Sequence, residues 1–138
     1  MDKRIHSFID EQKNLTFCTS VNNQPYCANC FYAFVDDEKL FVFKSDKTTR
    51  HISDALINEK VAGTILPDIS KTGTLRGIQY VGKFVLLTDE LFEKAKKHYY
   101  KKFPFATIVP GELWALELYS IKMTDNTLGF GKKLHWER

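Results

Sequence analysis

At 138 residues, with 43% hydrophobic and 14% aromatic side chains, the chain has the length and apolar content of one folded domain, residues 1–138, and not of a disordered protein. Its formal net charge of +3 is too small to argue for nucleic-acid binding by itself, although it suits an anionic ligand. The N-terminus lacks the apolar core of a signal peptide, and no window approaches the roughly 18 apolar residues of a membrane span.

The first third of the chain predicts a short helix followed by an antiparallel meander. Ile5, Phe8 and Ile9 recur at helical spacing, and the hydrophobic period changes to two from Leu15 onward. The segment 22–25 and the charged run 36–39 are typical of turns between strands. We therefore expect a helix over residues 2–13 and strands over residues 15–21, 26–35 and 40–44.

The rest of the chain alternates helices with strands. We expect a helix over residues 48–58 with Ile52, Ala55 and Leu56 on its buried face, and a helix that begins at Thr88 and stops at Pro104. The remaining predicted elements are strands over 61–66, 75–87 and 113–123, a loop over 67–73 and a turn over 127–131. Gly77 and Gly82 mark bulges or bends in the long strand 75–87.

Six predicted strands with interleaved helices in one small domain indicate the fold class. Strands left open at the edge of a sheet are prone to pair with other chains, and closure of the sheet removes those edges. We therefore predict a mainly β (α+β) fold, a six-stranded antiparallel split β-barrel with short flanking helices.

An apolar strand runs directly into a basic, hydroxyl-rich helix start in the segment 40–51. The polar residues of this segment are Lys44, Ser45, Asp46, Lys47, Thr48, Thr49, Arg50 and His51. The free N–H groups of a first helical turn and the positive end of the helix dipole favour an anionic group such as phosphate. The alternative is an ordinary surface helix, capped by Asp46, Thr48 or Thr49, whose cations are solvated.

The three cysteines do not form a metal or redox motif by their spacing. Cys27 and Cys30 are spaced C-x-x-C, but residues three apart in a strand point to opposite faces. No second Cys or His pair completes a four-ligand set. Together with Cys18 the cysteines are odd in number and lie in apolar surroundings, so we expect reduced, core-filling thiols, a cytoplasmic protein and no metal site.

Two further basic segments have both a binding and a structural interpretation. In the loop from Lys71 to Gly77, Arg76 would reach the same anion if the barrel brings the third and fifth strands together; otherwise Arg76 pairs with a surface carboxylate. The Lys-rich face of the helix after Thr88 is expected to face water and is better explained by solvation than by nucleic-acid binding. Its lysines are Lys94, Lys96, Lys97, Lys101 and Lys102. No carboxylate pair, nucleophile motif or nucleotide fingerprint stands out, and no residue is assigned as catalytic.

Short motifs along nearly the whole chain are similar to those of one small protein family within a larger superfamily. They are Cys27–Asn29, Phe31–Tyr32, Thr49–His51, Val61–Thr64, Arg76–Gly77, Gln79–Tyr80, Gly82, Phe103–Pro104, Trp114, Ile121–Lys122 and Thr124–Lys133. With them the chain resembles the flavin-nucleotide-binding split barrels, the pyridoxamine 5′-phosphate oxidase-like superfamily, and within it a small bacterial family. The broad resemblance is specific mainly from Pro25 to Asn58, whereas the closer one covers nearly all of the chain.

The resemblance implies FMN as the cofactor, bound at the interface of a homodimer. It implies that Lys44 and Ser45 at the end of the third strand, and Thr49 and Arg50 at the following helix start, hold the phosphate. The other residues that the resemblance implies at the cofactor are His51, where a Lys is common, Arg76 at the start of the long strand, Gln79 near the polar edge of the flavin, Asn29, and the backbone of Cys30, Phe31 and Tyr32 along the ring.

Several positions depart from the oxidases. Asn29 occupies the position of a phosphate-binding Arg, Phe34 that of a Lys, and Gly77 that of a flavin-contacting Gln. Each lost cation costs about 1–3 kcal/mol if its contact was charge-assisted. The C-terminal Trp and Arg that grip pyridoxal substrates have no clear counterpart, so pyridoxamine phosphate oxidation is not expected.

Three function classes remain at the level of the sequence. The leading expectation is a homodimeric FMN-binding protein, in its enzymatic form a small flavin-dependent oxidoreductase. The alternative is a non-enzymatic binding module for a flavin, a haem or another anionic aromatic ligand. A small basic barrel that binds single-stranded nucleic acid is a third class, which the weak net charge disfavours.

Overall fold

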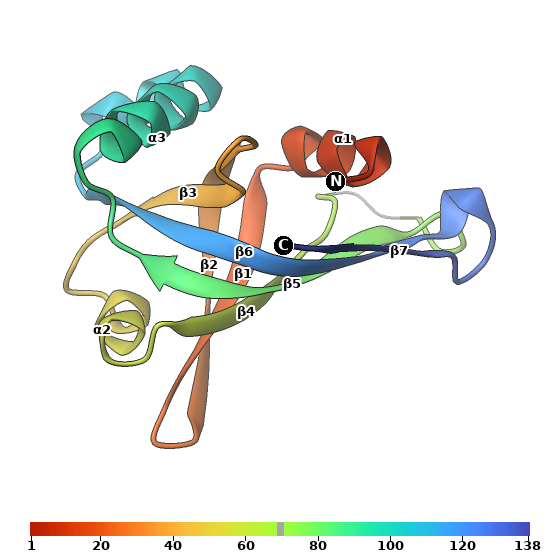
Figure 1. The fold of residues 1–138 in the computed structure, drawn as a ribbon, viewed down its shortest axis with the longest axis horizontal. Coiled ribbons are helices and arrows are strands. Elements are labelled where there is room, and N and C mark those ends of the chain that lie inside the picture. Colours follow the sequence, from red (N-terminus) through yellow and green to blue (C-terminus); the bar gives the residue numbers. More distant parts are fainter. Residues whose placement is uncertain (69–70) are drawn as a thin grey trace.

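The computed structural model describes residues 1–68 and 71–138, arranged as a curved sheet with three helices around it (Figure 1). The predicted loop 67–73 includes residues 69–70, which lie outside the described residues. The helices and strands are α1 (Lys3–Glu11), β1 (Asn14–Val21), β2 (Gln24–Val35), β3 (Leu40–Ser45), α2 (Arg50–Ile57), β4 (Lys60–Ile65), β5 (Arg76–Val85), α3 (Asp89–Lys102), β6 (Glu112–Asp125) and β7 (Lys133–Glu137), with 3₁₀ turns at Pro104–Ile108 and Asn126–Leu128.

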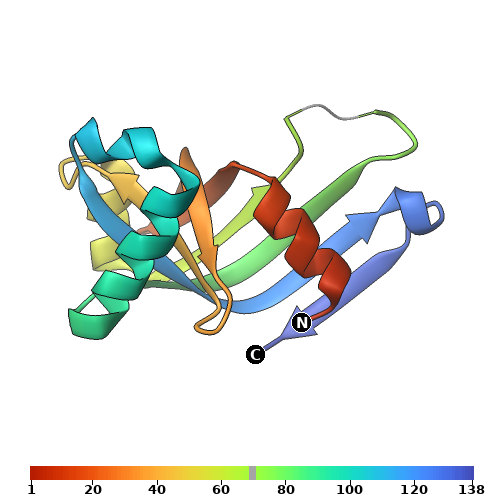
Figure 2. The same cartoon turned by 90° about the horizontal axis from the view of Figure 1, so that it is seen from above.

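Six of the strands close into a ring, which confirms the predicted split barrel. The sheet runs in the order β3-β2-β1-β4-β5-β6-β7, all neighbours are antiparallel, and β3 pairs in addition with β6. Figure 2 shows this curvature, with α1 lying across one side and α3 against another. Strand β7 lies outside the ring, on the far half of β6.

The split in the barrel lies along β2. Only its last four residues, Tyr32–Val35, pair with β3, while the segment Gln24–Phe31 pairs with β1 alone. The N–H of Tyr32 donates to the Lys13 carbonyl at 3.0 Å, so the backbone groups of Tyr32 point toward β1. Because these groups alternate along a strand, the N–H and C=O of Cys27, Asn29 and Phe31 point to the open side.

Side chains pack on both sides of the sheet. Inside the ring, Phe17, Phe41 and Tyr80 are among the largest buried side chains, and α1 adds Ile5, Phe8 and Ile9 to the same core. A second apolar cluster lies between α3 and the outward faces of β2, β3 and β6, with Ala95, Tyr99 and Phe103 on the helical side. Since both faces of β3 are buried, its Leu40–Phe43 run is continuously apolar.

Three details differ from the sequence-based expectation. The hairpin between β1 and β2 turns on two residues, Asn22 and Asn23, both at positive φ, and not on the four residues 22–25. Residues 133–137 form β7, a strand that was not predicted. On α2, Leu56 is 56% exposed instead of buried.

The two glycines of the long strand behave differently. The register of β5 shifts at Val81/Gly82, which confirms the bulge expected at Gly82. A Cβ atom at Gly82 would lie 2.3 Å from the Glu117 carbonyl oxygen, so only glycine fits where the backbones of β5 and β6 approach each other this closely. Gly77 keeps the register, and the atom nearest to a Cβ placed there belongs to the flexible side chain of Leu66.

Candidate functional site

A cluster of two hydroxyls and one imidazole forms where β3 ends and α2 begins. The Ser45 Oγ lies 2.6 Å from His51 Nε2 and 3.5 Å from Thr49 Oγ1, and Thr49 Oγ1 lies 3.2 Å from His51 Nε2. The Trp114 indole N–H donates to the Ser45 carbonyl at 3.0 Å and fixes the strand end. The structure thus brings together three of the residues that the sequence assigns to an anion site.

The turn before α2 leaves the helix start without a side-chain cap. The Asp46 carboxylate accepts from the Thr48 N–H at 2.7 Å and from the Thr48 hydroxyl at 2.6 Å, so it serves the turn and not the helix. Thr49 occupies the N-cap position, but its hydroxyl donates back to the Asp46 carbonyl at 2.8 Å. The first-turn N–H groups of α2 therefore have no side-chain acceptor, unlike those of an ordinary capped surface helix.

The surroundings of His51 disfavour the charged form of its ring. Its ring is half-buried and lies edge-on to Phe17, with 5.4 Å between ring centroids. Burial lowers the pKa of His51 below its usual value, and the nearby Asp54 carboxylate only partly offsets this effect. The cluster consequently offers hydrogen-bonding groups without a fixed positive charge of its own.

Arg50 supplies the cation next to this cluster. Its guanidinium lies over the Tyr26 ring of β2, 4.3 Å from the ring centroid, and its Nε lies 3.6 Å from the Asp54 carboxylate. The side chain is 53% exposed, so it remains available to an added anion. Arg50 therefore connects the start of α2 with the part of β2 that pairs with β1 alone.

Lys44 lies on the other face of β3. Its ammonium donates to the Tyr100 hydroxyl at 2.9 Å and to the Ala106 carbonyl at 2.8 Å, beside α3 and the 3₁₀ turn that follows it. Neighbouring residues of a strand point to opposite faces, so Lys44 cannot share a contact surface with the Ser45 hydroxyl. The structure does not bring Lys44 into the cluster.

The predicted residues of β2 divide between the two faces of the strand. Cys30 and Tyr32 are buried in the barrel, where the Tyr32 hydroxyl donates to the Ile9 carbonyl at 2.7 Å. Asn29 and Phe31 are exposed on the outward face, and Asn29 Oδ1 accepts from the Thr16 hydroxyl at 2.6 Å. Tyr26, which contacts Arg50, lies on the same face of β2 as Cys30, so the Asn29 side chain points away from Arg50. The backbone groups of Asn29 and Phe31 line the open edge of β2.

The cysteines differ in burial, contrary to the expectation of uniformly apolar surroundings. Cys30 is 8% exposed in the core, whereas Cys27 is exposed, so the C-x-x-C pair does point to opposite faces. None of the three is joined in a disulfide. Cys27 faces Cys18 across the β1–β2 ladder.

Arg76 and Gln79 lie at the far end of the barrel from the cluster. Ser45 pairs with Glu112 and Arg76 with Asp125, the two ends of β6, which puts about 40 Å of strand between them. Strand β6 also separates β3 from β5, so the condition for a shared anion is not met within one chain. Arg76 pairs instead with the Glu11 carboxylate at 3.4 Å, the alternative that the sequence left open.

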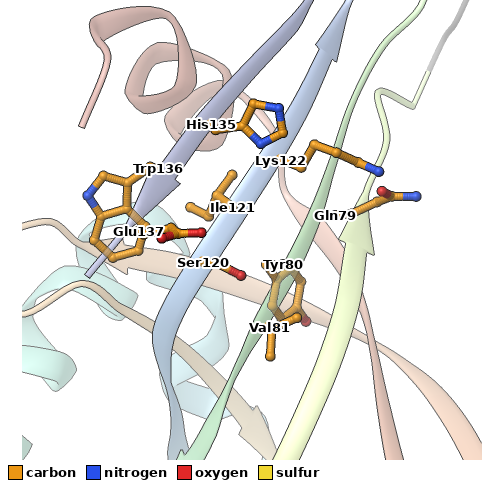
Figure 3. A pocket seen from close by; sticks show the side chains of 9 residues that line it. All are labelled: Gln79, Tyr80, Val81, Ser120, Ile121, Lys122, His135, Trp136 and Glu137. Atoms are coloured by element: carbon orange, nitrogen blue, oxygen red, sulfur yellow. The ribbon is translucent and has the colours of Figure 1, made fainter.

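Hollows at this far end include residues that the sequence reasoning missed. One, drawn in Figure 3, has a volume of about 220 Å³, and along its edge Gln79, Lys122 and His135 stand side by side on β5, β6 and β7. A second groove of about 300 Å³ has Leu66 and Leu75 on its apolar wall and also includes Gln79. Lys122 could have been found from strand alternation, but His135 depends on β7, which was not predicted.

The comparisons with known proteins agree with this architecture. No family model matches the chain. By structure, the chain is similar to a heme binding protein from Mycobacterium smegmatis (TM-score 0.77, 10% identity, 91% of this chain but only 53% of that one) and to a FAD-binding protein from Mesorhizobium loti (TM-score 0.72, 13% identity, 89% of this chain and 93% of that one). These similarities establish the split-barrel fold.

Sequence similarity extends over almost the entire chain. A UPF0306 protein from Photorhabdus laumondii is 42% identical over 134 residues, 97% of this chain and 94% of that protein. A UPF0306 protein from Yersinia pestis is 40% identical over the same length, 97% of this chain and 91% of that protein. Within residues 1–68 and 71–138, no helix is both long and apolar enough to cross a membrane. The identity and the coverage show that this chain belongs to the UPF0306 family.

Proposed function

We propose that this protein is a homodimeric FMN-binding split-barrel protein. The observation that carries the proposal is the uncapped start of α2, which stands beside the Ser45–Thr49–His51 cluster and the Arg50 guanidinium at the open edge of β2. Uncapped N–H groups, hydroxyls and one exposed guanidinium are the donors that a phosphate monoester requires.

The phosphate would lie at the start of α2. Ser45 would donate a hydroxyl hydrogen bond, and Arg50 would supply the charge-assisted contact. The Thr49 hydroxyl would donate to the phosphate only by turning away from the Asp46 carbonyl, to which it donates in this structure. His51 would donate from its ring and gain a proton more readily beside an anion. Lys44 has no part in this site, because its ammonium is held on the opposite face of β3 by Tyr100 and Ala106.

The isoalloxazine ring would lie along the open edge of β2. The N–H and C=O groups of Cys27, Asn29 and Phe31 point there, and such backbone groups suit the polar edge of a flavin. Phe31 is 49% exposed and offers an aromatic surface to the ring. Phe34 lies in the barrel core with only 6% exposure, so the cation that the oxidases carry at that position has no equivalent here.

A second copy of the chain would complete the site. Gln79 and Arg76 lie too far from Ser45 to meet the same ligand within one chain. The apolar groove formed by Leu66 and Leu75 beside Gln79 has the size and lining suited to one side of an aromatic ligand. In a symmetric dimer the groove of one protomer would meet the helix start of the other, and both ends of the barrel would contribute.

A bound flavin would supply electron transfer, and the protein would contribute orientation and electrostatics. In its enzymatic form the protein would be a small flavin-dependent oxidoreductase. The residues described above bind and orient, and none needs to carry a proton for this role.

Haem is the second candidate ligand, favoured by the similarity of the fold to a heme binding protein. Haem is also an anionic aromatic molecule, and its carboxylates could be held by the same hydroxyls and by Arg50. The module would then store or sense its ligand without turnover.

Absorbance and fluorescence titrations of the purified protein distinguish these ligands. FMN should bind saturably, and riboflavin, which lacks the phosphate, should bind at least tenfold more weakly if the start of α2 holds that group. Sedimentation with and without FMN tests the dimer. Equal affinities for FMN and riboflavin would contradict a phosphate site at the start of α2. Binding of haem alone would favour a protein that stores or senses haem.

A further inference from the structure

We propose that Cys18 and Cys27 are a redox-active dithiol, which low-molecular-weight disulfides oxidise to an intrachain disulfide across the β1–β2 hairpin. The proposal concerns a site outside the Ser45–Thr49–His51 cluster. It does not depend on FMN binding.

The register of the hairpin places the two cysteines directly opposite each other. Cys18 pairs with Cys27, and the Sγ atoms lie 2.7 Å apart. The Tyr32 N–H bonds to the Lys13 carbonyl, so by alternation the Cys18–Cys27 pair is of the non-hydrogen-bonded type. Such pairs have their Cα atoms about 4.5 Å apart, within the range that a disulfide spans. No backbone rearrangement is needed to join the two sulfur atoms.

The two thiols differ in access, which sets the order of their reactions. Cys27 is exposed on the outward face of β2, and Cys18 is half-buried. Burial and the hydrogen bond with Cys27 raise the pKa of Cys18 to about 11, so Cys18 is not the first nucleophile at neutral pH. Cys30 lies on the inner face of β2, and burial raises its pKa to about 12, which keeps the third thiol out of the exchange.

The exchange is balanced in two steps. The Cys27 thiolate attacks one sulfur of the small disulfide, a Cys27–S–S–R bond forms, and one R–S⁻ leaves. The Cys18 thiol then loses its proton and attacks the Cys27 sulfur, the Cys18–Cys27 bond forms, and the second R–S⁻ leaves. The protein loses two electrons and two protons, and the small disulfide gains the two electrons as it becomes two thiols.

The disulfide would join the strands in the projecting part of the hairpin. Figure 1 shows the β1–β2 hairpin extending well beyond the other strands. Beyond Cys18, β1 pairs only with β2, because the β1–β4 ladder covers Thr16, Phe17 and Cys18. A covalent bond at this point would hold in register the part of the hairpin that pairs with no third strand, next to the open edge of β2.

Differential alkylation with oxidised glutathione as the oxidant tests the proposal. All three cysteines fall on one tryptic peptide, residues 14–39, so tandem mass spectrometry must assign each label. The oxidised protein is denatured and alkylated with a light maleimide, then reduced and alkylated with its heavy form. We expect the light label on Cys30 alone and the heavy label on Cys18 and Cys27, with no glutathione retained.

Two variants sharpen the result. Cys30→Ala should close the same bond as the wild type. Cys18→Ala should instead keep glutathione on Cys27, because the resolving thiol is gone. Glutathione retained on wild-type Cys27, a disulfide-linked dimer through Cys27, or unreacted thiols under conditions that oxidise a free cysteine peptide would each overturn the proposal.

Discussion

Ser45 and His51 lie six residues apart on two different elements, yet the Ser45 hydroxyl is 2.6 Å from the His51 ring nitrogen. The contact is made by the short turn between β3 and α2, which Asp46 closes through its carboxylate. The His51 imidazole is directed at the end of β3. Among the described residues of this helix start, Arg50 is the cation that contacts β2, where it lies over the Tyr26 ring. Arg50 therefore carries the cationic contact between the start of α2 and β2.

Replacement of Arg50 should weaken FMN binding. Arg50→Ala removes one charge-assisted contact, and we expect a loss of about 1–3 kcal/mol in binding free energy, read from a fluorescence titration at fixed salt. Lys97→Ala is the matched control, since Lys97 is an exposed cation on α3, far from α2 in sequence. An unchanged FMN constant in Arg50→Ala would take this residue out of the site.

The free energy of unfolding should fall on acidification because of His51. The folded protein holds the pKa of His51 below the unfolded value of 6.5, so the unfolded chain takes up the proton first as the pH drops. The stabilisation is fully present above pH 6.5 and is lost as the pH falls toward the lowered folded value. Urea unfolding at pH 7.5, 6 and 5 should show a smaller loss of unfolding free energy for His51→Gln than for the wild type. An equal dependence of the unfolding free energy on pH in both proteins would contradict the lowered pKa of His51.

The close approach of β5 to β6 should not tolerate a methyl group at Gly82. Gly82→Ala would bring the new Cβ to 2.3 Å from a backbone carbonyl oxygen, and we expect a destabilisation of about 1–3 kcal/mol in chemical denaturation. Gly77→Ala on the same strand is the matched control. There the nearest atom belongs to the flexible and exposed Leu66 side chain, so the cost should be much smaller. Similar costs for both variants would argue against the bulge.

Lys102 should titrate well below other lysines. Burial lowers its pKa to about 8, and the Asp10 carboxylate offsets only part of this effect. The unfolded chain keeps the proton up to about pH 10.5, so unfolding free energy should rise between pH 8 and 10.5. NMR of the ¹³C-methylated protein, with Lys102→Arg to assign the signal, should show one lysine with a midpoint near 8. A Lys102 signal that titrates at the ordinary value would contradict the partial burial of its ammonium in the structure.

Much of the fold was predictable because most elements have a clear period. The alternation from Leu15 to Val21 is typical of a strand with one buried face, and the apolar run Leu40–Phe43 is typical of a strand buried on both faces. Strand β7 was missed because the sequence Lys133–Glu137 is short and polar, and only its alternating half-buried Leu134 and Trp136 mark it. Lys102 was expected to face water, but its ammonium reaches the Gln12 carbonyl at 2.5 Å, a contact between distant segments that no local pattern indicates.

The candidate site was only partly predictable. The segment after β3 is local in sequence, so its hydroxyls, His51 and Arg50 could be proposed together as a candidate anion site from the sequence. Lys44 was grouped with them although strand alternation separates it from Ser45. The pairing of Cys18 with Cys27 depends on a two-residue turn at Asn22–Asn23; a four-residue turn would have shifted the partner of Cys18 by two positions to Asn29.

The pairing of β3 with β6 has a consequence for synthesis of the chain. Residues Leu40–Ser45 meet Glu112–Glu117, which leave the ribosome roughly 70 residues later. Until then the nascent chain presents one apolar edge of β3 with no partner, a surface that favours association between unfinished chains. Truncated chains that end before residue 112 should therefore depend on chaperones or aggregate. Only a chain long enough to include β6 can cover this edge of β3.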